Sequence, residues 1–252
     1  MIDFGKTAKD YATHRAGFPA SFYEWLEKYG VDFVGKNIVD IGTGTGTLAR
    51  GFASRGANVI GIDPSAPLLE QARNLAAREN LDIQFIVGTA ESTRLADHSI
   101  DIVCAGQCWH WFDRPRAALE CRRILKPGGH IIIAHFDWIP LPGNVVAETE
   151  ALIQAHNPNW KMHGGTGIHG KWFVDLSGAG FSDLLSHSHD EFAPYSHEAW
   201  RGRIRASAGI AASLSPDAVA KFDAEHARLL SEKFPEEPLQ THHRVFFLLG
   251  RA

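Results

Sequence analysis

Short apolar runs alternate with longer amphipathic stretches in the part of the chain from Lys36 to His135. Each apolar run has the length of a strand that is buried on both faces, and each stretch between two runs has the apolar spacing of a helix. Strands are predicted at residues 37–41, 58–62, 81–87, 100–105 and 130–135, and helices at 48–54, 67–78 and 116–125. Strands that alternate with helices in this way form a parallel sheet wound by right-handed crossovers.

The rest of the chain is less regular but adds two strands to the same sheet. Residues 1–35 form an N-terminal segment with short helices, interrupted at Gly17 and Pro19. Beyond residue 136, helices are predicted at 145–156, 196–207 and 216–233, and strands at 183–192 and 244–249. The sequence therefore predicts an α/β protein with a doubly wound, mostly parallel, Rossmann-like sheet of seven strands. We expect one domain over residues 1–252, with a core at 36–136 and helical cap segments at 137–180 and 195–235.

The composition excludes several classes of protein. With 44% hydrophobic residues and a net charge of −4, the chain can bury enough apolar surface to fold. No apolar run approaches the ~18 residues of a membrane helix, and residues 1–30 lack the pattern of a signal peptide. The three cysteines form no CxxC pair, which fits a reducing cytoplasm. The slight acidic excess argues against a nucleic-acid partner, so we expect a cytoplasmic monomer or homodimer with no membrane partner.

A glycine-rich loop follows the first predicted strand of the sheet, in the run Val39-Asp40-Ile41-Gly42-Thr43-Gly44-Thr45-Gly46. Glycines at alternate positions let a ligand touch the backbone where a strand turns into a helix, although a plain tight turn is the alternative. Asp63 follows about 20 residues later, at the end of the second strand, where a carboxylate can accept both hydroxyls of a ribose. The loop and the acid together predict a nucleotide-like ligand at the carboxyl edge of the sheet.

The spacing of the loop distinguishes between nucleotides. In a dinucleotide fingerprint the third glycine comes three residues after the second, but Thr47 occupies that position here. Asp40, close to the first glycine, would repel a pyrophosphate. A cofactor with an ammonium group and no phosphates, such as S-adenosylmethionine, fits better than a nicotinamide dinucleotide.

Five motifs in order over residues 36–136 resemble those of class I S-adenosylmethionine-dependent methyltransferases of the small-molecule type. They are the glycine loop, Gly61-Ile62-Asp63-Pro64-Ser65, Gly88-Thr89-Ala90-Glu91, Asp101-Ile102-Val103-Cys104-Ala105-Gly106-Gln107 and Leu125-Lys126-Pro127-Gly128-Gly129. Within this class, the segments at 11–15 and 18–19, His110-Trp111-Phe112-Asp113, and Arg203–Arg205 are similar to the trans-aconitate methyltransferase subgroup.

The resemblance implies a set of cofactor-binding residues. Tyr11 and Arg15 match residues that lie over the methionine tail of the cofactor, although Arg15 on a solvated helix is the alternative. Gln107 matches a side chain that bonds cofactor or substrate, with a structural turn contact as the other interpretation. The remaining positions serve the methionine end, the ribose and the adenine: Asp40, Gly42, Thr43, Gly44, Gly46, Asp63, Pro64, Ala90 and Glu91.

Candidate acceptor residues follow the fourth strand. A histidine in water has a pKa near 6.5, which makes His110 the candidate general base, with helix packing as the alternative. Trp109, Trp111 and Trp138 are candidates for a substrate wall, although core packing explains part of the tryptophan set. Arg205 shares a helix face with Arg201, which a solvated basic face explains first. If this helix caps the pocket, Arg205 would favour an anionic acceptor such as a carboxylic acid.

No metal site is expected, because the histidines form no HxxxH motif and no zinc-like set with the cysteines. The glycine-rich segment from His163 to Gly170 is predicted to be a mobile lid.

The sequence therefore predicts an enzyme that moves the methyl group of S-adenosylmethionine to oxygen, nitrogen or sulfur of a small-molecule acceptor. A nicotinamide-dependent oxidoreductase and a non-catalytic, cofactor-binding homologue remain as alternatives.

Overall fold

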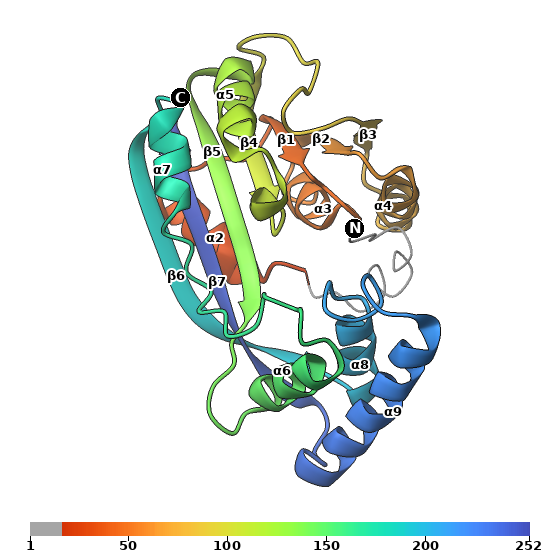
Figure 1. The fold of residues 1–252 in the computed structure, drawn as a ribbon. Helices are drawn as coiled ribbons and strands as arrows, with labels where there is room; N and C mark the ends of the chain where they lie inside the picture. Colours follow the sequence, from red (N-terminus) through yellow and green to blue (C-terminus); the bar gives the residue numbers. More distant parts are fainter. Residues whose placement is uncertain (1–16) are drawn as a thin grey trace. The chain divides into compact units, whose positions relative to one another are not determined.

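The computed structural model describes residues 17–252, so the predicted residues Tyr11 and Arg15 lie outside the described part. The first half of the chain alternates strands and helices as expected (Figure 1). Its elements are α2 (Ala20–Lys28), β1 (Asn37–Ile41), α3 (Thr47–Ala53), β2 (Asn58–Asp63), α4 (Ala66–Arg78), β3 (Ile83–Val87), β4 (Ile100–Gly106), the 3₁₀ turn η2 (Trp109–Trp111), α5 (Arg114–Ile124) and β5 (Leu125–Trp138).

The second half of the chain contributes helices and the last two strands. Its elements are α6 (Val145–His156), α7 (Trp172–Gly178), β6 (Ser182–Tyr195), α8 (His197–Arg205), α9 (Pro216–Lys233) and β7 (Leu239–Arg251). The sheet has seven strands in the order β3-β2-β1-β4-β5-β7-β6. The predicted α/β class and the mostly parallel, Rossmann-like sheet are therefore confirmed.

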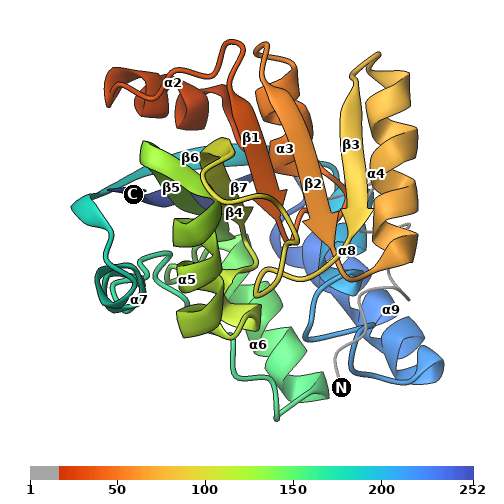
Figure 2. The same ribbon diagram turned by 90° about the horizontal axis from the view of Figure 1, so that it is seen from above.

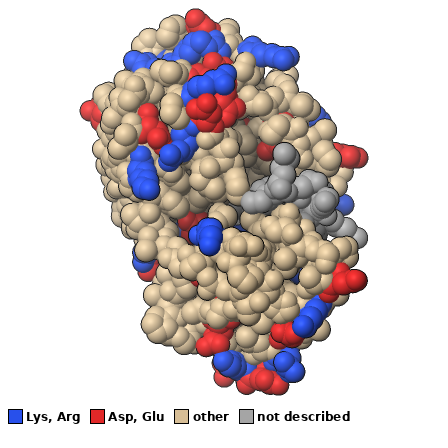
Figure 3. All heavy atoms as spheres, in the orientation of Figure 1, with Lys and Arg blue, Asp and Glu red and all other residues tan. Residues whose placement is uncertain are grey.

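The described chain divides into two compact units, which are treated separately below. The sheet unit consists of Gly17–Phe136, His169–Ser188 and Val245–Ala252, and it contains the glycine loop. The helical unit consists of Asp137–Ile168 and His189–Arg244. No helix in the described part of the chain has both the length and the apolar character needed to cross a bilayer. On the face in Figure 3, basic and acidic side chains are interspersed.

The centre of the sheet unit is β1, which pairs in parallel with β2 on one side and β4 on the other. Asp40 on β1 is in register with Gly61 on β2 and Cys104 on β4. Figure 2 shows β1, β2 and β3 lying side by side, with α3 and α4 next to them. After β1 the chain adds β2 and β3 on one side of β1, and it then adds β4 on the other side. Folds of this kind bind ligands at the carboxyl ends of the two strands between which the order reverses, which here are β1 and β4.

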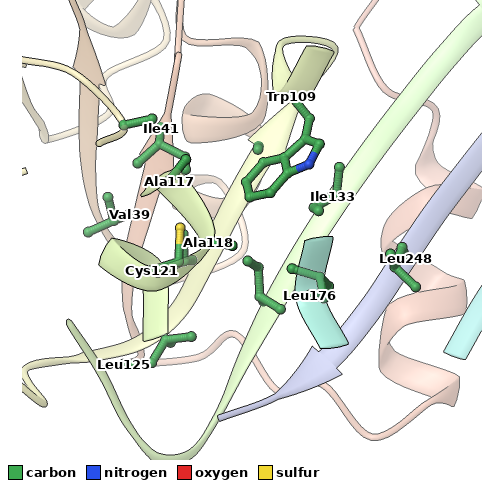
Figure 4. Close-up of a cluster of buried hydrophobic side chains, with 14 of the residues drawn as sticks. Val39, Ile41, Trp109, Ala117, Ala118, Cys121, Leu125, Ile133, Leu176 and Leu248 are labelled. Atoms are coloured by element: carbon green, nitrogen blue, oxygen red, sulfur yellow. The ribbon is translucent and has the colours of Figure 1, made fainter. Parts of the chain in front are cut away.

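One face of the sheet is covered by α5 and α7 (Figure 4). Ala117, Cys121 and Ile124 on α5 follow helical spacing and are fully buried, so this helix presents an apolar stripe to the strands. The inward-facing side chains of β1, β4, β5 and β7, together with Trp109 and Leu176, complete the cluster. Apolar contact with the sheet therefore holds both helices.

The opposite face of the sheet carries an aromatic cluster from α2, α3 and β7. Phe22 on α2 lies 6.4 Å from Phe52 on α3 and 5.9 Å from Phe247 on β7, measured between ring centroids. Both contacts are edge-on, the arrangement that aromatic rings prefer. Since Phe246 belongs to the cluster on the other face, consecutive β7 residues fill both layers.

The helical unit has buried side chains of its own, from α6, α8 and α9. Trp200, Ile204 and Phe222 are fully buried. The Trp200 indole donates to Thr149 Oγ1 at 3.1 Å, and the same hydroxyl lies 3.1 Å from His226 Nε2. Burial lowers the pKa of His226 to about 4, so its imidazole is neutral at physiological pH. Thr149 therefore joins Trp200 to His226, and the neutral imidazole adds no charge to this interior.

Two features of the fold differ from the sequence prediction. The predicted turn at residues 126–129 lies inside β5, where the pairing with β4 shifts register between Ile100 and Ile102. The Gly128 amide bonds the Ala252 carbonyl at 3.0 Å and the Ala252 amide bonds the Gly129 carbonyl at 2.9 Å, so the C-terminal residue supplies a strand-like partner. Helix α7, in the glycine- and histidine-rich stretch, was not predicted.

Two substitutions in α5 test the assignment of its buried face. Ile124→Ala should lower the free energy of unfolding by about 2–5 kcal/mol, because it leaves a cavity under the helix. Leu119→Ala, at a side chain that is 57% exposed in the same helix, should change it by no more than about 0.5 kcal/mol. Urea unfolding of both variants checks this, and equal losses would contradict the packing of α5.

Candidate functional site

The glycine loop between β1 and α3 is bound to the end of β2 by hydrogen bonds from its backbone amides. The Thr43 amide donates to the Ile62 carbonyl at 3.0 Å, and the Gly44 amide donates to Asp63 Oδ2 at 2.9 Å. The Gly46 amide closes the turn on the Thr43 carbonyl at 2.8 Å. The loop is therefore an ordered part of the sheet edge.

Two glycines of this loop are required for different physical reasons. A Cβ on Gly42 would lie 2.8 Å from both Cys108 Sγ and Phe112 Cζ, so that position is closed by protein. Gly44 has φ +55°, and apart from its neighbours in sequence no atom of the described residues 17–252 lies within 4 Å of the place of its Cβ. Gly44 thus presents bare backbone to open space, as a cradle for a ligand requires.

Asp40 lies under the loop and is almost completely buried. Its Oδ2 accepts hydrogen bonds from the Thr43 hydroxyl at 2.6 Å and the Ala49 amide at 3.1 Å, and Cys104 Sγ lies 3.6 Å from Oδ1. Burial raises the pKa of Asp40 to about 7, while these hydrogen bonds oppose the increase. The carboxyl group therefore connects the strand to the loop and to the first turn of α3.

Asp63 connects the loop to the segment that follows β2. Its Oδ1 accepts from the Ser65 amide at 2.8 Å, and its Oδ2 holds Gly44. Burial raises the pKa of Asp63, and the two amide hydrogen bonds lower it. Because each carboxylate oxygen has two acceptor positions, Asp63 retains capacity for the hydroxyls of a ligand. Pro64, the next predicted residue, is exposed.

The predicted adenine segment lies beside Asp63. The Gly88 amide donates to the Asp63 carbonyl at 3.2 Å, which ties the end of β3 to the end of β2. Ala90 is buried, and Glu91 Oε1 accepts from the Asp113 amide at 2.9 Å. The structure therefore brings the predicted ribose and adenine residues to one edge of the sheet unit.

Gln107 lies at the end of β4 with an unusual backbone conformation, φ +59°. Its amide donates to the Ala134 carbonyl at 2.8 Å, and its Nε2 donates to the Phe136 carbonyl at 2.9 Å. Both bonds join β4 to β5, in line with the structural interpretation considered above. A strained residue at the carboxyl edge of the sheet is a common feature of functional sites.

His110 is exposed in η2 and belongs to a cluster that the sequence did not reveal. Its ring lies 4.6 Å from that of Trp111 and 5.5 Å from that of His135 on β5. The ring centre of His135 in turn lies 4.3 Å from that of His169, and the His169 ring stacks on Trp172 with 4.0 Å between the ring centres. The only signal in the sequence was the position of His135 at the end of a predicted strand, on the same edge as His110.

The nitrogens of His135 and His169 that could bind a metal lie within 4.8 Å of each other. Two imidazoles at this spacing can share a metal ion. The expectation that the chain has no metal site thus stays a prediction.

The two tryptophans beside His110 have different environments. Trp109 is fully buried in the cluster under α5, and its indole nitrogen donates to Asp175 Oδ2 at 3.1 Å. Trp111 is 44% exposed. The position of Trp109 favours core packing, and Trp111 is the residue of the pair that a ligand can reach.

The predicted acceptor residues Trp138 and Arg205 belong to the helical unit. Trp138 donates its indole hydrogen to Glu150 Oε1 at 2.8 Å. Arg205 forms ion pairs with Asp223 at 2.8 Å and Glu198 at 2.9 Å, and Arg201 also pairs with Asp223. The positive charge of Arg205 therefore already has acidic partners.

The predicted lid segment is bound at two points within the helical unit. The Gly164 amide donates to Glu150 Oε2 at 2.8 Å, and Arg244 Nη1 donates to the Thr166 carbonyl at 2.8 Å. Movement of this segment stays a prediction.

Comparison with known proteins agrees with this geometry. Residues 39–133 match the family model of a methyltransferase domain. An uncharacterized methyltransferase of Mycobacterium tuberculosis is 32% identical over 130 residues, which cover 52% of this chain and 50% of the relative. The chain thus spans about half the length of such curated relatives.

Solved structures share the fold at low sequence identity. The YcgJ protein of Bacillus subtilis has a TM-score of 0.60 at 21% identity, over 93% of this chain and 99% of that one. A phosphoethanolamine N-methyltransferase of Haemonchus contortus, solved with S-adenosylhomocysteine, has a TM-score of 0.58 at 18% identity, over 100% of this chain and 60% of that one. Residues 39–133 are therefore similar to a methyltransferase domain, and they lie on the Rossmann-like sheet that this chain shares with those solved structures.

Proposed function

We propose that the chain is an enzyme that transfers the methyl group of S-adenosylmethionine to an oxygen, nitrogen or sulfur atom of a small-molecule acceptor. The observation that carries this proposal is the open side of Gly44, flanked by Asp63 at the carboxyl edge of the sheet. A loop of this kind offers bare backbone and a carboxylate to a nucleoside, and the buried Asp40 disfavours a diphosphate.

The predicted cofactor residues contact different parts of S-adenosylmethionine along this edge. The loop residues Gly42, Thr43 and Gly44 take the methionine end, and Asp63 with Pro64 takes the ribose. Ala90 and Glu91 take the adenine. Asp40 acts on the ammonium group from beneath the loop, and Gln107, Tyr11 and Arg15 remain predicted contacts.

Methyl transfer depends more on the position of the acceptor than on the transfer of a proton. When bound, S-adenosylmethionine supplies a sulfonium methyl group whose departure leaves a neutral thioether. The chain must hold the acceptor in line with that group and exclude water. The exposed face of Trp111 is suited to contact with a cation. His110, beside Trp111, accepts the proton of an acceptor that must lose one.

The acceptor we propose is a small molecule, as in the trans-aconitate methyltransferase subgroup that the chain resembles. Amino-group DNA methyltransferases carry a proline-rich motif after the fourth strand, where this chain has Ala105-Gly106-Gln107-Cys108. The monomeric or dimeric state and the cytoplasmic location remain part of the same proposal.

Calorimetry with three ligands tests the proposal. S-adenosylmethionine and S-adenosylhomocysteine should bind the chain, and a nicotinamide dinucleotide should not. Formation of S-adenosylhomocysteine across a library of small acceptors then tests turnover. Binding of the dinucleotide alone would favour an oxidoreductase, and cofactor binding without any turnover would favour a non-catalytic homologue.

Asp63→Ala should weaken binding of S-adenosylmethionine by about 1–3 kcal/mol, because hydrogen bonds to a charged acceptor are lost. Asp101→Ala is the matched control. Asp101 also accepts from a backbone amide, that of Asn37 at 2.9 Å, but at the amino ends of β1 and β4. Titration calorimetry of both variants measures the difference. Equal affinities in the two variants would refute the ribose role of Asp63.

Gly44→Ala should weaken binding of S-adenosylmethionine about tenfold or more, because its methyl group would occupy the open side of the loop. Gly35→Ala is the control, since Gly35 also has a positive φ, +69°, and apart from its sequence neighbours no described atom lies within 4 Å of the place of its Cβ. Both variants should lose similar stability from backbone strain. A Gly44→Ala protein that binds like the Gly35→Ala protein would show that the ligand lies elsewhere.

His110→Ala should lower turnover about 100-fold while leaving the affinity for S-adenosylhomocysteine unchanged, because a general base acts only in the chemical step. His98→Ala, at another exposed histidine, should retain turnover. A loss smaller than tenfold would assign His110 to packing.

A further inference from the structure

Two histidines of the sheet unit that the proposed function does not use lie against each other. His135 belongs to β5 and is buried, and His169 comes shortly before α7 and is half-buried. Their ring centres are 4.3 Å apart, and the nitrogens that they could offer to a metal ion lie within 4.8 Å of each other. Helix α6 separates the two residues in the sequence, so the fold of the chain brings them together.

Trp172 fixes the positions of both imidazoles. The His169 ring stacks on the Trp172 ring with 4.0 Å between centres and 1° between planes, and the centre of the His135 ring lies 4.8 Å from that of the same indole. The Trp172 amide donates to the His169 carbonyl at 3.2 Å, which ties His169 to the start of α7. Trp172 itself is buried in the apolar cluster that covers one face of the sheet. Packing therefore holds the two rings at their spacing without a ligand, as a preformed site requires.

Strand β5 gives His135 a fixed position at the carboxyl edge of the sheet. The residue before it, Ala134, is in register with Gly106 at the end of β4, and the Ala134 carbonyl accepts from the Gln107 amide at 2.8 Å. The ring centre of the exposed His110 lies 5.5 Å from that of His135. One member of the histidine pair therefore lies on a paired strand, which positions a ligand more precisely than a loop does.

The chemistry of the imidazole ring determines which ion such a pair can bind. Imidazole nitrogens suit Zn²⁺, Ni²⁺ and Cu²⁺, whereas Mg²⁺ and Ca²⁺ prefer oxygen ligands. Two nitrogens at about 2.1 Å from one tetrahedral Zn²⁺ lie about 3.4 Å apart. A modest shift of the half-buried His169 therefore brings the pair around an ion. The other positions of the tetrahedron are then left to water or to a small molecule.

We propose that His135 and His169 form a binding site for a divalent transition-metal ion such as Zn²⁺. The inference goes beyond the proposed function and does not depend on it. No HxxxH motif marks this site, because its two ligands come from β5 and from the segment before α7. Aromatic packing is the other role open to the two rings, and binding of a metal ion distinguishes the two roles.

Calorimetry with metal salts tests the site on the full chain, after treatment with a chelator and removal of that chelator. The wild-type chain should bind a single equivalent of Zn²⁺ more tightly than any further equivalent, and Mg²⁺ should not compete for it. Saturating Zn²⁺ should also raise the melting temperature of the wild type, because an ion that binds only the folded chain stabilises it.

His169→Phe keeps a ring that can stack on Trp172 and removes the nitrogen ligand. It should weaken binding of Zn²⁺ about tenfold or more, since even the loss of a group that only supports a metal ligand has an effect of this size. His187→Phe is the matched control, because His187 is also a half-buried histidine of the sheet unit and stacks on Phe247 with 5.3 Å between ring centres. This control should retain the wild-type affinity for Zn²⁺.

Co²⁺ gives a readout that needs no variant, which keeps the test decisive if His169→Phe does not fold. Co²⁺ bound to the wild type should show the visible absorption of an ion held by imidazole nitrogens, and Zn²⁺ should displace it. A spectrum of hydrated Co²⁺ alone would overturn the site. Equal Zn²⁺ affinities of the wild type and the His169→Phe protein would assign the pair to aromatic packing. An equal loss of affinity in the His187→Phe protein would place the ion elsewhere, and binding of Mg²⁺ in place of Zn²⁺ would overturn the choice of ion.

Discussion

The hydrogen bond from the Gly44 amide to the Asp63 carboxylate is the interaction on which the carboxyl edge of the sheet depends. It joins the loop after β1 to the end of β2, two segments separated by the whole of α3. A hydrogen bond to a charged acceptor stabilises by about 1.5–3 kcal/mol, more than one between neutral groups. Because Asp63 also holds the Ser65 amide, one carboxylate sets the positions of both backbone segments.

Much of the fold could be predicted because the relevant signals are local. Helix α9 begins at Pro216 after Ser215, whose side chain caps the Ala218 amide, and helix α6 begins after Asn144, which caps Ala147. Both helices have the predicted bounds. The extension of β5 through Lys126–Gly129 could not be predicted, because its partner for those residues is Ala252 at the other end of the chain.

The residues of the candidate site also divide into those that the local sequence predicts and those whose environment depends on distant residues. The loop and Asp63 are close in sequence, and their glycines and acid indicate a ligand without knowledge of the fold. Trp109 and Arg205 could not be interpreted in that way. Their environments are set by Asp175 and Asp223, which are distant in the sequence. A side chain that binds a distant partner looks the same in the sequence as one that awaits a ligand.

The buried carboxyl group of Asp40 has a consequence for how the loop responds to acidity. Because burial raises its pKa to about 7, this group titrates close to neutral pH. A cation that settles against the loop favours the ionised form and releases that proton to solvent. Occupancy of the loop by a cationic ligand is therefore linked to proton release, and acidification opposes it.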